Sequence, residues 1–339
     1  MYMSDQQTSR SKYGRKLKSL VIAGTAASCL VLAAMPGTAS AKTAAPQHFV
    51  VGFISNDLTN PFQATMSKAG VAEAKKLGIT DHLVSGNVSG TISISKQVSE
   101  VQTFISQKVN MILISPSNPN AIVPAIKQAN AAGVPVMAVN TEVGPGAKVV
   151  TFVGDNDYQY GVLEGKLVAQ ALHGHGNIAL LLGVLGDSPE VLRTEGIKNE
   201  LKHYPGIHIV TSLVDNWVNS TDISDVQDLL AKYPGNKLNA IVAEGPEIYA
   251  GAEYARSHGN KTMKFIAGDY STEVEAAIKN GAVYGTVDQD PSIEGKLALE
   301  FAYDWLTGHK SMVKQPADYI PLPLVTKANV AHYQATWSS

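Results

Sequence analysis

Residues 50–63 read VVGFISNDLTNPFQ, and apolar residues at helical spacing follow as far as Leu77. The apolar run at the start ends in polar turn residues and therefore predicts a buried strand. Asn60 can cap the helix that follows, and Pro61 suits its first position, where a missing N–H costs nothing. Such a strand would bring a polar loop and the ring of Phe62 to the carboxyl edge of a sheet, where open α/β folds bind ligands.

The same alternation of strand and helix repeats in two rounds, over about 49–153 and 177–287. Continuous runs of Val, Ile and Leu, such as 109–114, indicate strands buried on both faces and hence parallel sheets. A helix at 290–306 and one strand near 319–324 remain after the second round, which suggests that the chain crosses back. The sequence therefore predicts an α/β protein of two Rossmann-like lobes with parallel sheets, joined by a multi-strand hinge that can close around a ligand.

The lobes are expected to share more than one connection, with the hinge near Gly154 and Gln289. The expected division is a signal peptide at 1–41, an N-terminal lobe of 42–153 with about 290–320, and a C-terminal lobe of 154–289 with about 321–339.

The first 41 residues have the pattern of a secretory signal peptide. A basic region precedes an apolar stretch from Leu20 to Met35, and small residues end at Ala41, where cleavage into the periplasm is expected. A retained membrane anchor is the alternative, although the stretch is short and rich in small residues for a spanning helix. Lipid anchoring at Cys29 is a further alternative, but the preceding residues lack the usual leucine. Cleavage would leave no cysteine, and so neither a disulfide nor a thiolate.

Composition and missing motifs exclude several classes of protein. A hydrophobic content of 45% and a charged content of 17% are typical of a compact chain, and a net charge of −2 gives no sign of nucleic-acid binding. The sequence has no dinucleotide or phosphate loop after the first strand, no G-x-S-x-G and no H-E-x-x-H, so neither a cofactor nor an enzyme is indicated. His173 and His175 fall at a helix end without further ligands and indicate a turn rather than a metal site.

Four stretches resemble the periplasmic sugar-binding proteins of bacterial ABC importers, of the ribose-binding type. They read TNPF at 59–62, NMILISP at 110–116, GVPV at 133–136 and FIAGD at 265–269. The resemblance covers about 49–330. It implies an exported, monomeric protein that holds a sugar or polyol between its lobes and delivers it to an inner-membrane ABC permease.

The resemblance also implies a set of pocket residues. Asn60 and Phe62 match the polar and aromatic pair after the first strand, Arg193 a sugar-binding arginine, Asp269 a carboxylate, and Gln289 a glutamine of the crossover.

Other pocket positions depart from the family pattern. Asn56 and Gln63 differ in type, Trp217 replaces another aromatic, and Asn140 with Thr141 stands where the family has Asp-Arg. Glu244 precedes Gly245-Pro246, where the family has Asn-Asp. These changes retain the scaffold but not the ribose-type pattern.

The residue types suit a hydroxyl-rich ligand. Planar polar side chains can bond adjacent hydroxyls, and aromatic rings can cover a C–H face. Hydrogen bonds to charged groups contribute about 1.5–3 kcal/mol, so Arg193 and Asp269 are expected to dominate the affinity, while Phe62 and Trp217 set the shape.

Structural interpretations remain open for several of these residues. Asn60 and Asp269 could serve only as helix caps, Phe62 could belong to the core, Arg193 could pair with nearby glutamates, and Glu244 could face water or a cationic ligand group.

Alternatives to a transport role also stay open. They are a ligand sensor for a chemoreceptor or sensor kinase, a receptor for a non-sugar solute, and a secreted α/β enzyme. A transcription regulator of the lactose-repressor kind would need a helix-turn-helix where the signal peptide lies.

Overall fold

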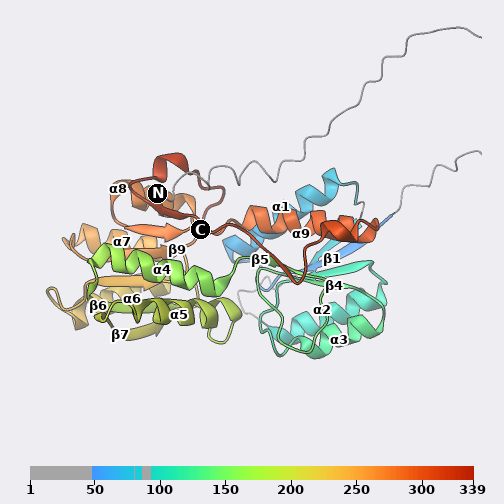
Figure 1. Cartoon of the computed structure of the whole chain (residues 1–339), viewed down its shortest axis with the longest axis horizontal. Helices are drawn as coiled ribbons and strands as arrows, with labels where there is room; N and C mark the ends of the chain where they lie inside the picture. The colour runs from blue at the N-terminus through green and yellow to red at the C-terminus, as the bar shows by residue number, and fades with distance from the viewer. Residues whose placement is uncertain (1–47, 80, 86–92) are drawn as a thin grey trace, which may run out of the picture. The chain divides into compact units, whose positions relative to one another are not determined.

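The computed structural model describes residues 48–79, 81–85 and 93–339 (Figure 1). The expected signal peptide lies outside the described residues. Within the described part, no helix combines the length and apolar character that crossing a bilayer requires.

The first sheet is parallel throughout its described pairings and has the order β2-β1-β3-β4-β5-β11. Its strands are β1 (Val50–Ile54), β2 (Asp81–Ser85), β3 (Met111–Ile114), β4 (Val136–Val139), β5 (Phe152–Gly154) and β11 (Ala317–Tyr319). Helices α1 (Pro61–Lys76) and α9 (Pro291–Leu306) cover one face, and α2 (Ile94–Ser106) and α3 (Val123–Ala131) cover the other.

Successive side chains of β3 show why this sheet is buried on both sides. Met111 and Leu113 pack with residues of α1 and α9, whereas Ile112 and Ile114 pack with residues of α2 and α3. All four side chains are completely buried. The continuous apolar run thus serves two cores at once, as the alternation of side chains along a strand requires.

The second sheet repeats the plan with the order β7-β6-β8-β9-β10-β12. Its strands are β6 (His175–Leu182), β7 (Gly206–Val214), β8 (Ala240–Ala243), β9 (Lys264–Gly268), β10 (Gly285–Val287) and β12 (Leu324–Thr326), the last of which runs antiparallel to β10. One face carries α4 (Asp157–Leu172) and α5 (Ser188–Leu201), and the other carries α6 (Asn219–Lys232), α7 (Ile248–Ser257) and α8 (Thr272–Asn280).

The single strand expected near 319–324 is wrong. Two short strands, β11 and β12, stand there instead, and they belong to different sheets. Pro321 and Pro323 lie between them, and proline has no N–H to donate to a sheet ladder, so one continuous strand cannot form.

Three connections between the sheets meet at one place. Gln289, which follows β10, donates from Nε2 to Oδ1 of Asp155, which follows β5, at 2.9 Å. The third connection joins both of the others, since Ile320 N donates to Gly154 O at 2.7 Å and Asp288 N donates to Pro323 O at 2.9 Å. The crossovers therefore form one hydrogen-bonded group, while a hinge motion at this place stays a prediction.

Close helix packing positions the first part of the site. A Cβ on Gly161 of α4 would lie 2.0 Å from the carbonyl oxygen of Arg193, and one on Gly196 of α5 would lie 2.2 Å from Tyr158 O. Because these glycines lack a side chain, α5 approaches α4 closely enough for the Arg193 side chain to reach Gln289.

Candidate functional site

A cavity of about 660 Å³ lies at the carboxyl ends of the strands and is lined by residues that follow strands of both sheets. Open α/β folds bind ligands at this edge. Nine of the expected site residues line this cavity, namely Asn56, Asn60, Phe62, Gln63, Asn140, Arg193, Trp217, Asp269 and Gln289. Their contact with a ligand stays a prediction.

The loop from β1 to α1 supplies the first wall. Asn60 caps α1, because its Oδ1 accepts from Phe62 N at 2.9 Å and from Gln63 N at 3.3 Å. Its amide nitrogen is not needed for the cap and can face a ligand. Gln63 accepts from Ser55 Oγ at 2.9 Å and donates to Asn140 Oδ1 at 2.8 Å, so the two expected amides hold one another in place. The same loop therefore caps α1 and forms part of the cavity wall.

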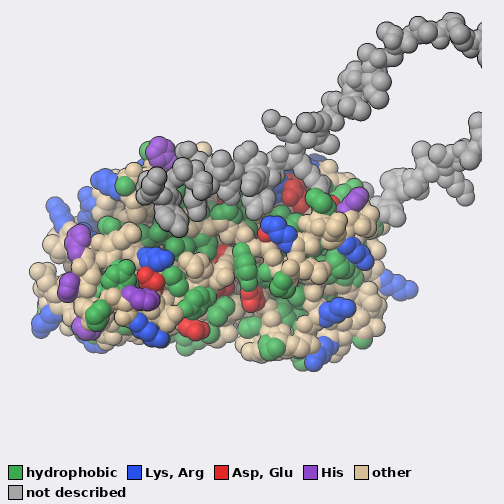
Figure 2. Space-filling view, in the orientation of Figure 1, with side chains coloured by type: hydrophobic (Ala, Val, Ile, Leu, Met, Phe, Trp, Pro, Cys, Tyr) green, Lys and Arg blue, Asp and Glu red, His purple; other side chains and the backbone are tan. Residues whose placement is uncertain are grey.

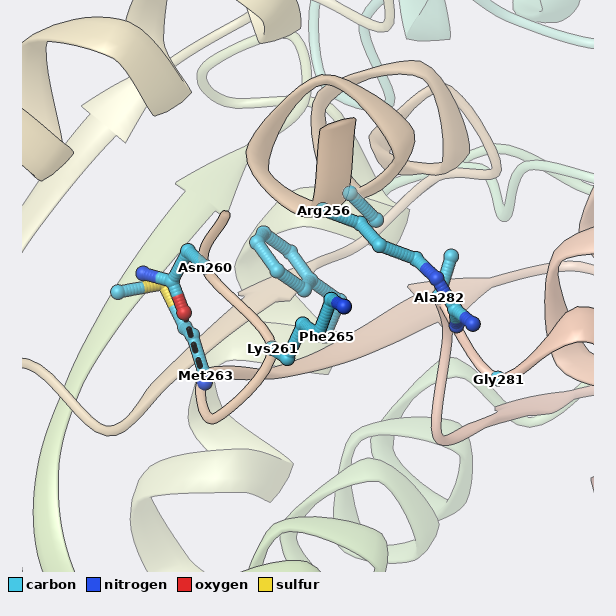
Figure 3. Close-up of a pocket in the computed structure, with 8 residues that line it drawn as sticks. Arg256, Asn260, Lys261, Met263, Phe265, Gly281 and Ala282 are labelled. Atoms are coloured by element: carbon cyan, nitrogen blue, oxygen red, sulfur yellow. Dashed lines mark hydrogen bonds between the residues drawn. The ribbon is translucent and has the colours of Figure 1, made fainter. Parts of the chain in front are cut away.

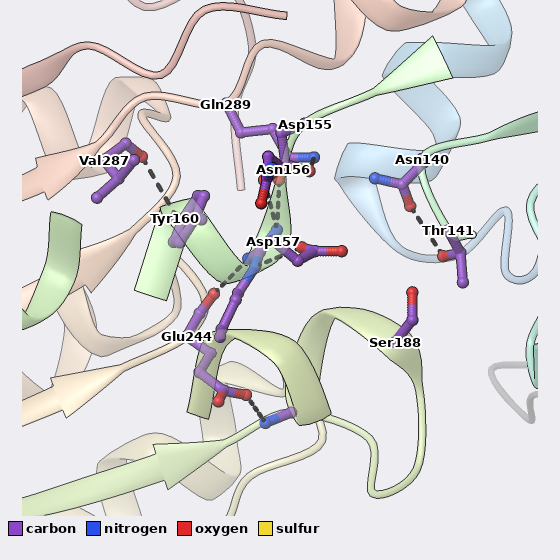
Figure 4. Close-up of polar contacts among 12 residues, drawn as sticks. Asn140, Thr141, Asp155, Asn156, Asp157, Tyr160, Ser188, Glu244, Val287 and Gln289 are labelled. Atoms are coloured by element: carbon purple, nitrogen blue, oxygen red, sulfur yellow. Dashed lines mark hydrogen bonds and ion pairs between the residues drawn. The ribbon is translucent and has the colours of Figure 1, made fainter. Parts of the chain in front are cut away.

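Arg193 connects the cavity to a crossover between the sheets. Its guanidinium donates from Nε to Asp157 Oδ1 at 2.9 Å, from Nη1 to the Glu244 carbonyl at 2.9 Å and from Nη2 to Gln289 Oε1 at 2.6 Å. It also lies 3.8 Å above the centre of the Tyr160 ring. These hydrogen bonds use three of the five guanidinium N–H groups, and the carboxylates of Asp155 and Asp269 lie 3.8 Å from Nη2 and 3.9 Å from Nη1. Figure 4 shows Asp157, Tyr160 and Gln289 in the same region of the structure.

Asp269 is held by the hydroxyl of Tyr160. That hydroxyl accepts from Asp269 N at 2.5 Å and lies 3.1 Å from Asp269 Oδ1, to which it can donate. The carboxylate is 3.9 Å from Arg193 Nη1. Burial raises the pKa of Asp269 to about 6, and the nearby guanidinium of Arg193 opposes the rise. Ser271 rather than Asp269 caps α8, so the capping interpretation of Asp269 does not apply.

Trp217 owes its position to an unusual backbone. Asn216 and Trp217 have φ of 56° and 57°, and Asp215 Oδ1 accepts from Trp217 N at 2.7 Å. A Cβ on Gly183 would lie 2.1 Å from the indole, so the glycine leaves room for the ring. Asn140 and Asp269, which also line the cavity, have positive φ as well. Strained backbone of this kind is typical of functional sites.

Two expected residues do not reach the cavity wall. Thr141 is completely buried, and its amide donates to Val139 O at 2.7 Å. Glu244 is 1% exposed, and its carboxyl accepts from Gly183 N at 3.0 Å and from Thr194 Oγ1 at 2.7 Å. Burial raises the pKa of Glu244 to about 8. The structure thus places Glu244 as a support beneath the wall.

Several lining residues escaped the sequence analysis, and Asp187, Glu247 and Trp337 are three of them. Asp187 follows β6 and caps α5, which is the same pattern that pointed to Asn60, so it could have been found. Glu247 lies three residues after Glu244 in the same loop. Burial raises the pKa of both Asp187 and Glu247 to about 8. Trp337 follows the last described strand, where no strand-to-helix pattern marks it.

A smaller cavity of about 180 Å³ lies elsewhere, beside α7 and the strand β9 (Figure 3). Two of its polar side chains have partners, because Asn260 Oδ1 accepts from Met263 N at 3.1 Å and Arg256 Nη1 donates to Asn280 O at 2.6 Å. None of the expected site residues line it. In the described ranges, no group of three His, Cys, Asp or Glu residues could hold a metal ion.

Comparison with known proteins gives a consistent set of matches. A family model described as a periplasmic binding protein domain matches residues 51–310. The chain is 31% identical over 264 residues to a ribose import binding protein of Bacillus subtilis, which covers 78% of this chain and 84% of that protein. It is 29% identical over 243 residues to a xylitol-binding protein of Mycolicibacterium smegmatis, covering 71% of this chain and 68% of that protein.

A solved structure has the same architecture. An ABC transporter solute-binding protein of Bacillus halodurans, with bound myo-inositol, superposes with a TM-score of 0.78 at 25% identity. The match covers 86% of this chain and 99% of that one. The two-lobed α/β fold expected from the sequence is therefore confirmed.

Proposed function

Because this chain belongs to the periplasmic binding protein family, whose members bind substrates for transport rather than convert them, we propose that it captures a sugar or polyol for an ABC importer. The ligand binds in the cavity between the strand ends of the two sheets. The protein then delivers it to a permease in the inner membrane. The relatives named for ribose and xylitol, and the structure with myo-inositol, support this class of ligand.

The composition of the cavity wall carries the proposal. The cavity is surrounded by polar side chains and aromatic rings. Among them are the amides of Asn60 and Asn140, the guanidinium of Arg193, the carboxylate of Asp269 and the ring of Trp217. A hydroxyl both donates and accepts, and this set offers partners for both roles. The aromatic surface suits the C–H face of a sugar or cyclitol.

We propose that the protein has two lobes. One consists of residues 42–153 with about 290–320, and the other consists of residues 154–289 with about 321–339. The ligand closes them about the hinge at Gly154 and Gln289, because it contacts both walls of the cavity and so favours the state in which they approach. The closed form is the one that the permease recognises. We further propose that the protein acts as a monomer and is exported after cleavage following Ala41.

A ligand screen tests the proposal. The full chain is expressed in a bacterium, and the exported protein is purified and heated with pentoses, hexoses, deoxysugars, polyols and amino acids in turn. A bound ligand raises the melting temperature by mass action. A rise with a sugar or polyol, which is recovered unchanged afterwards, supports the proposal. A rise with amino acids alone, or conversion of the bound compound, contradicts it. Mass spectrometry of the purified protein's N-terminus locates the cleavage site.

A further inference from the structure

Trp337 lines the cavity although nothing in the strand and helix pattern assigned it a role. Its side chain is buried, and its ring meets that of Phe62 edge to face, with the ring centres 5.5 Å apart and an angle of 89° between the planes. Phe62 follows the first strand of the first sheet. The two rings thus form one aromatic corner of the cavity, and the position of each limits the other.

The backbone around Trp337 is hydrogen-bonded to α8, a helix that packs on the second sheet. Thr272 N, at the start of α8, donates to Trp337 O at 2.9 Å. Ala335 N donates to Glu275 Oε2 at 2.8 Å, and Ser339 N donates to Glu273 Oε2 at 2.9 Å. The segment 335–339 is therefore held on α8 on both sides of Trp337, while the indole reaches across to Phe62. A side chain placed in this way would approach a ligand from a different direction than the residues that follow β1 and β9.

The indole N–H of Trp337 has no acceptor among the described residues, and the nitrogen is buried. A buried donor without a partner is unfavourable, and in native proteins such a group calls for an explanation. The other tryptophan in the wall, Trp217, is half-buried. A ligand hydroxyl that enters the cavity can supply the acceptor that the protein does not.

We propose that Trp337 is a specificity-determining residue of this site. Its ring covers a C–H face of the ligand beside Phe62, and its N–H donates to one ligand hydroxyl. The inference rests on the proposed function of the cavity and adds a ligand contact from the segment 335–339. It also predicts that the ligand holds this segment, α8 and the loop after β1 together.

Two substitutions separate the parts of this role. Trp337→Phe keeps a ring beside Phe62 but removes the N–H, and Trp337→Ala removes both. Trp305→Phe is the matched control, because Trp305 lies on α9, packs against the core of the first sheet and does not line the cavity. Dissociation constants are measured by calorimetry on the exported protein with D-ribose, D-allose, myo-inositol and xylitol.

For whichever probe the wild type binds, Trp337→Phe is expected to weaken binding about 5- to 10-fold, the effect of one hydrogen bond. Trp337→Ala is expected to weaken it about 100-fold, because the ring contact is lost as well. The control should bind as the wild type does. In a variant with Trp217→Phe and Trp305→Phe, Trp337 is the sole tryptophan of the three, and its emission should change on binding.

The outcomes distinguish this inference from the function on which it rests. Wild-type affinity in both Trp337 variants overturns the inference and leaves the function intact. Wild-type affinity in Trp337→Phe alone overturns the hydrogen bond and retains the ring contact. If Trp337→Ala unfolds, Trp337→Phe and the emission of Trp337 decide. If none of the four probes binds the wild type, the tightest sugar or polyol from the thermal screen takes their place. A screen in which no sugar or polyol binds contradicts the proposed ligand class and the inference together.

Discussion

Nη2 of Arg193 donates to Oε1 of Gln289 at 2.6 Å, and both residues line the cavity. Arg193 belongs to α5 of the second sheet, whereas Gln289 belongs to the crossover that leads into α9. Gln289 in turn donates to Asp155 on the neighbouring crossover at 2.9 Å. Two of the side chains expected to hold the ligand thus also join the crossovers between the sheets. A ligand bonded to Arg193 would therefore contact a residue that is itself hydrogen-bonded to a crossover.

Replacement of Arg193 by alanine should destabilise the protein as well as weaken binding. Asp157 would be left buried without its partner at 2.9 Å, and breaking a buried ion pair from one side costs about 3–5 kcal/mol. Urea denaturation at pH 7 measures the loss. Arg193→Lys, which keeps the charge but not the fork of donors, should fall between alanine and the wild type. An alanine variant as stable as the wild type would contradict the role of Arg193 in the hinge.

Asp269→Asn should affect binding far more than stability. Asparagine keeps the size of the side chain and can still bond the hydroxyl of Tyr160, but it loses the charge that strengthens a bond to a ligand hydroxyl. We expect the dissociation constant to rise about 10- to 100-fold, since bonds to charged groups contribute about 1.5–3 kcal/mol. Calorimetry measures it, with Asp228→Asn on the exposed side of α6 as the control. Equal affinity in the variant and the control would remove Asp269 from the site.

Gly183→Ala should displace the ring of Trp217. The new Cβ would lie 2.1 Å from the indole, a distance that atoms cannot keep, so the ring must move. Overpacking of this kind costs about 1–3 kcal/mol, and we expect binding to weaken about 10-fold or more. Tryptophan emission reports the movement in the ligand-free protein. An unchanged spectrum together with unchanged affinity would show that Trp217 does not shape the site.

Stability should fall as the pH rises from about 4.5 toward 8. Burial raises the pKa of Glu247 from 4.5 to about 8, so the folded state keeps a proton that the unfolded state loses. Stability from this group is complete below pH 4.5 and is lost as the pH passes through about 8. Asp187 adds to the effect, since burial raises its pKa to about 8 as well.

Melting temperatures between pH 5 and pH 8 measure this dependence. Glu247→Gln should make the decline with pH shallower, because glutamine has no proton to lose. Glu195→Gln, at an exposed position of α5, should leave it as in the wild type. A decline that is equally steep in both variants would contradict the burial of Glu247 as its cause.

Figure 2 shows acidic side chains toward the middle of the visible face, whereas most lysines and arginines lie nearer its periphery.

The sequence predicted what depends on local rules. Apolar runs such as that of β3 indicate strands with two buried faces, and the cap at Asn60 marks both a helix start and a wall of the cavity. Asp269 and Gln289 came from the resemblance rather than from any local pattern. The structure brings both to the cavity, together with seven of the other expected residues.

Features that depend on the path of the backbone in space escaped prediction. Two glutamates lie in one loop, and only the contacts of Glu244 with Gly183 and Thr194 turn it beneath the wall while Glu247 lines it. Trp337 is distant in sequence from Phe62, and neither residue indicates the other. Prolines interrupt the strand expected near 319–324. A prediction based only on a run of apolar residues does not take them into account.

A crystal structure with the tightest ligand from the screen tests the central claim most directly. The account predicts a sugar or polyol in the cavity, with hydroxyls within hydrogen-bonding distance of Asn60, Arg193 and Asp269 and a ring face against Trp217. A ligand bound outside this cavity, or one that touches residues of only one sheet, would contradict it.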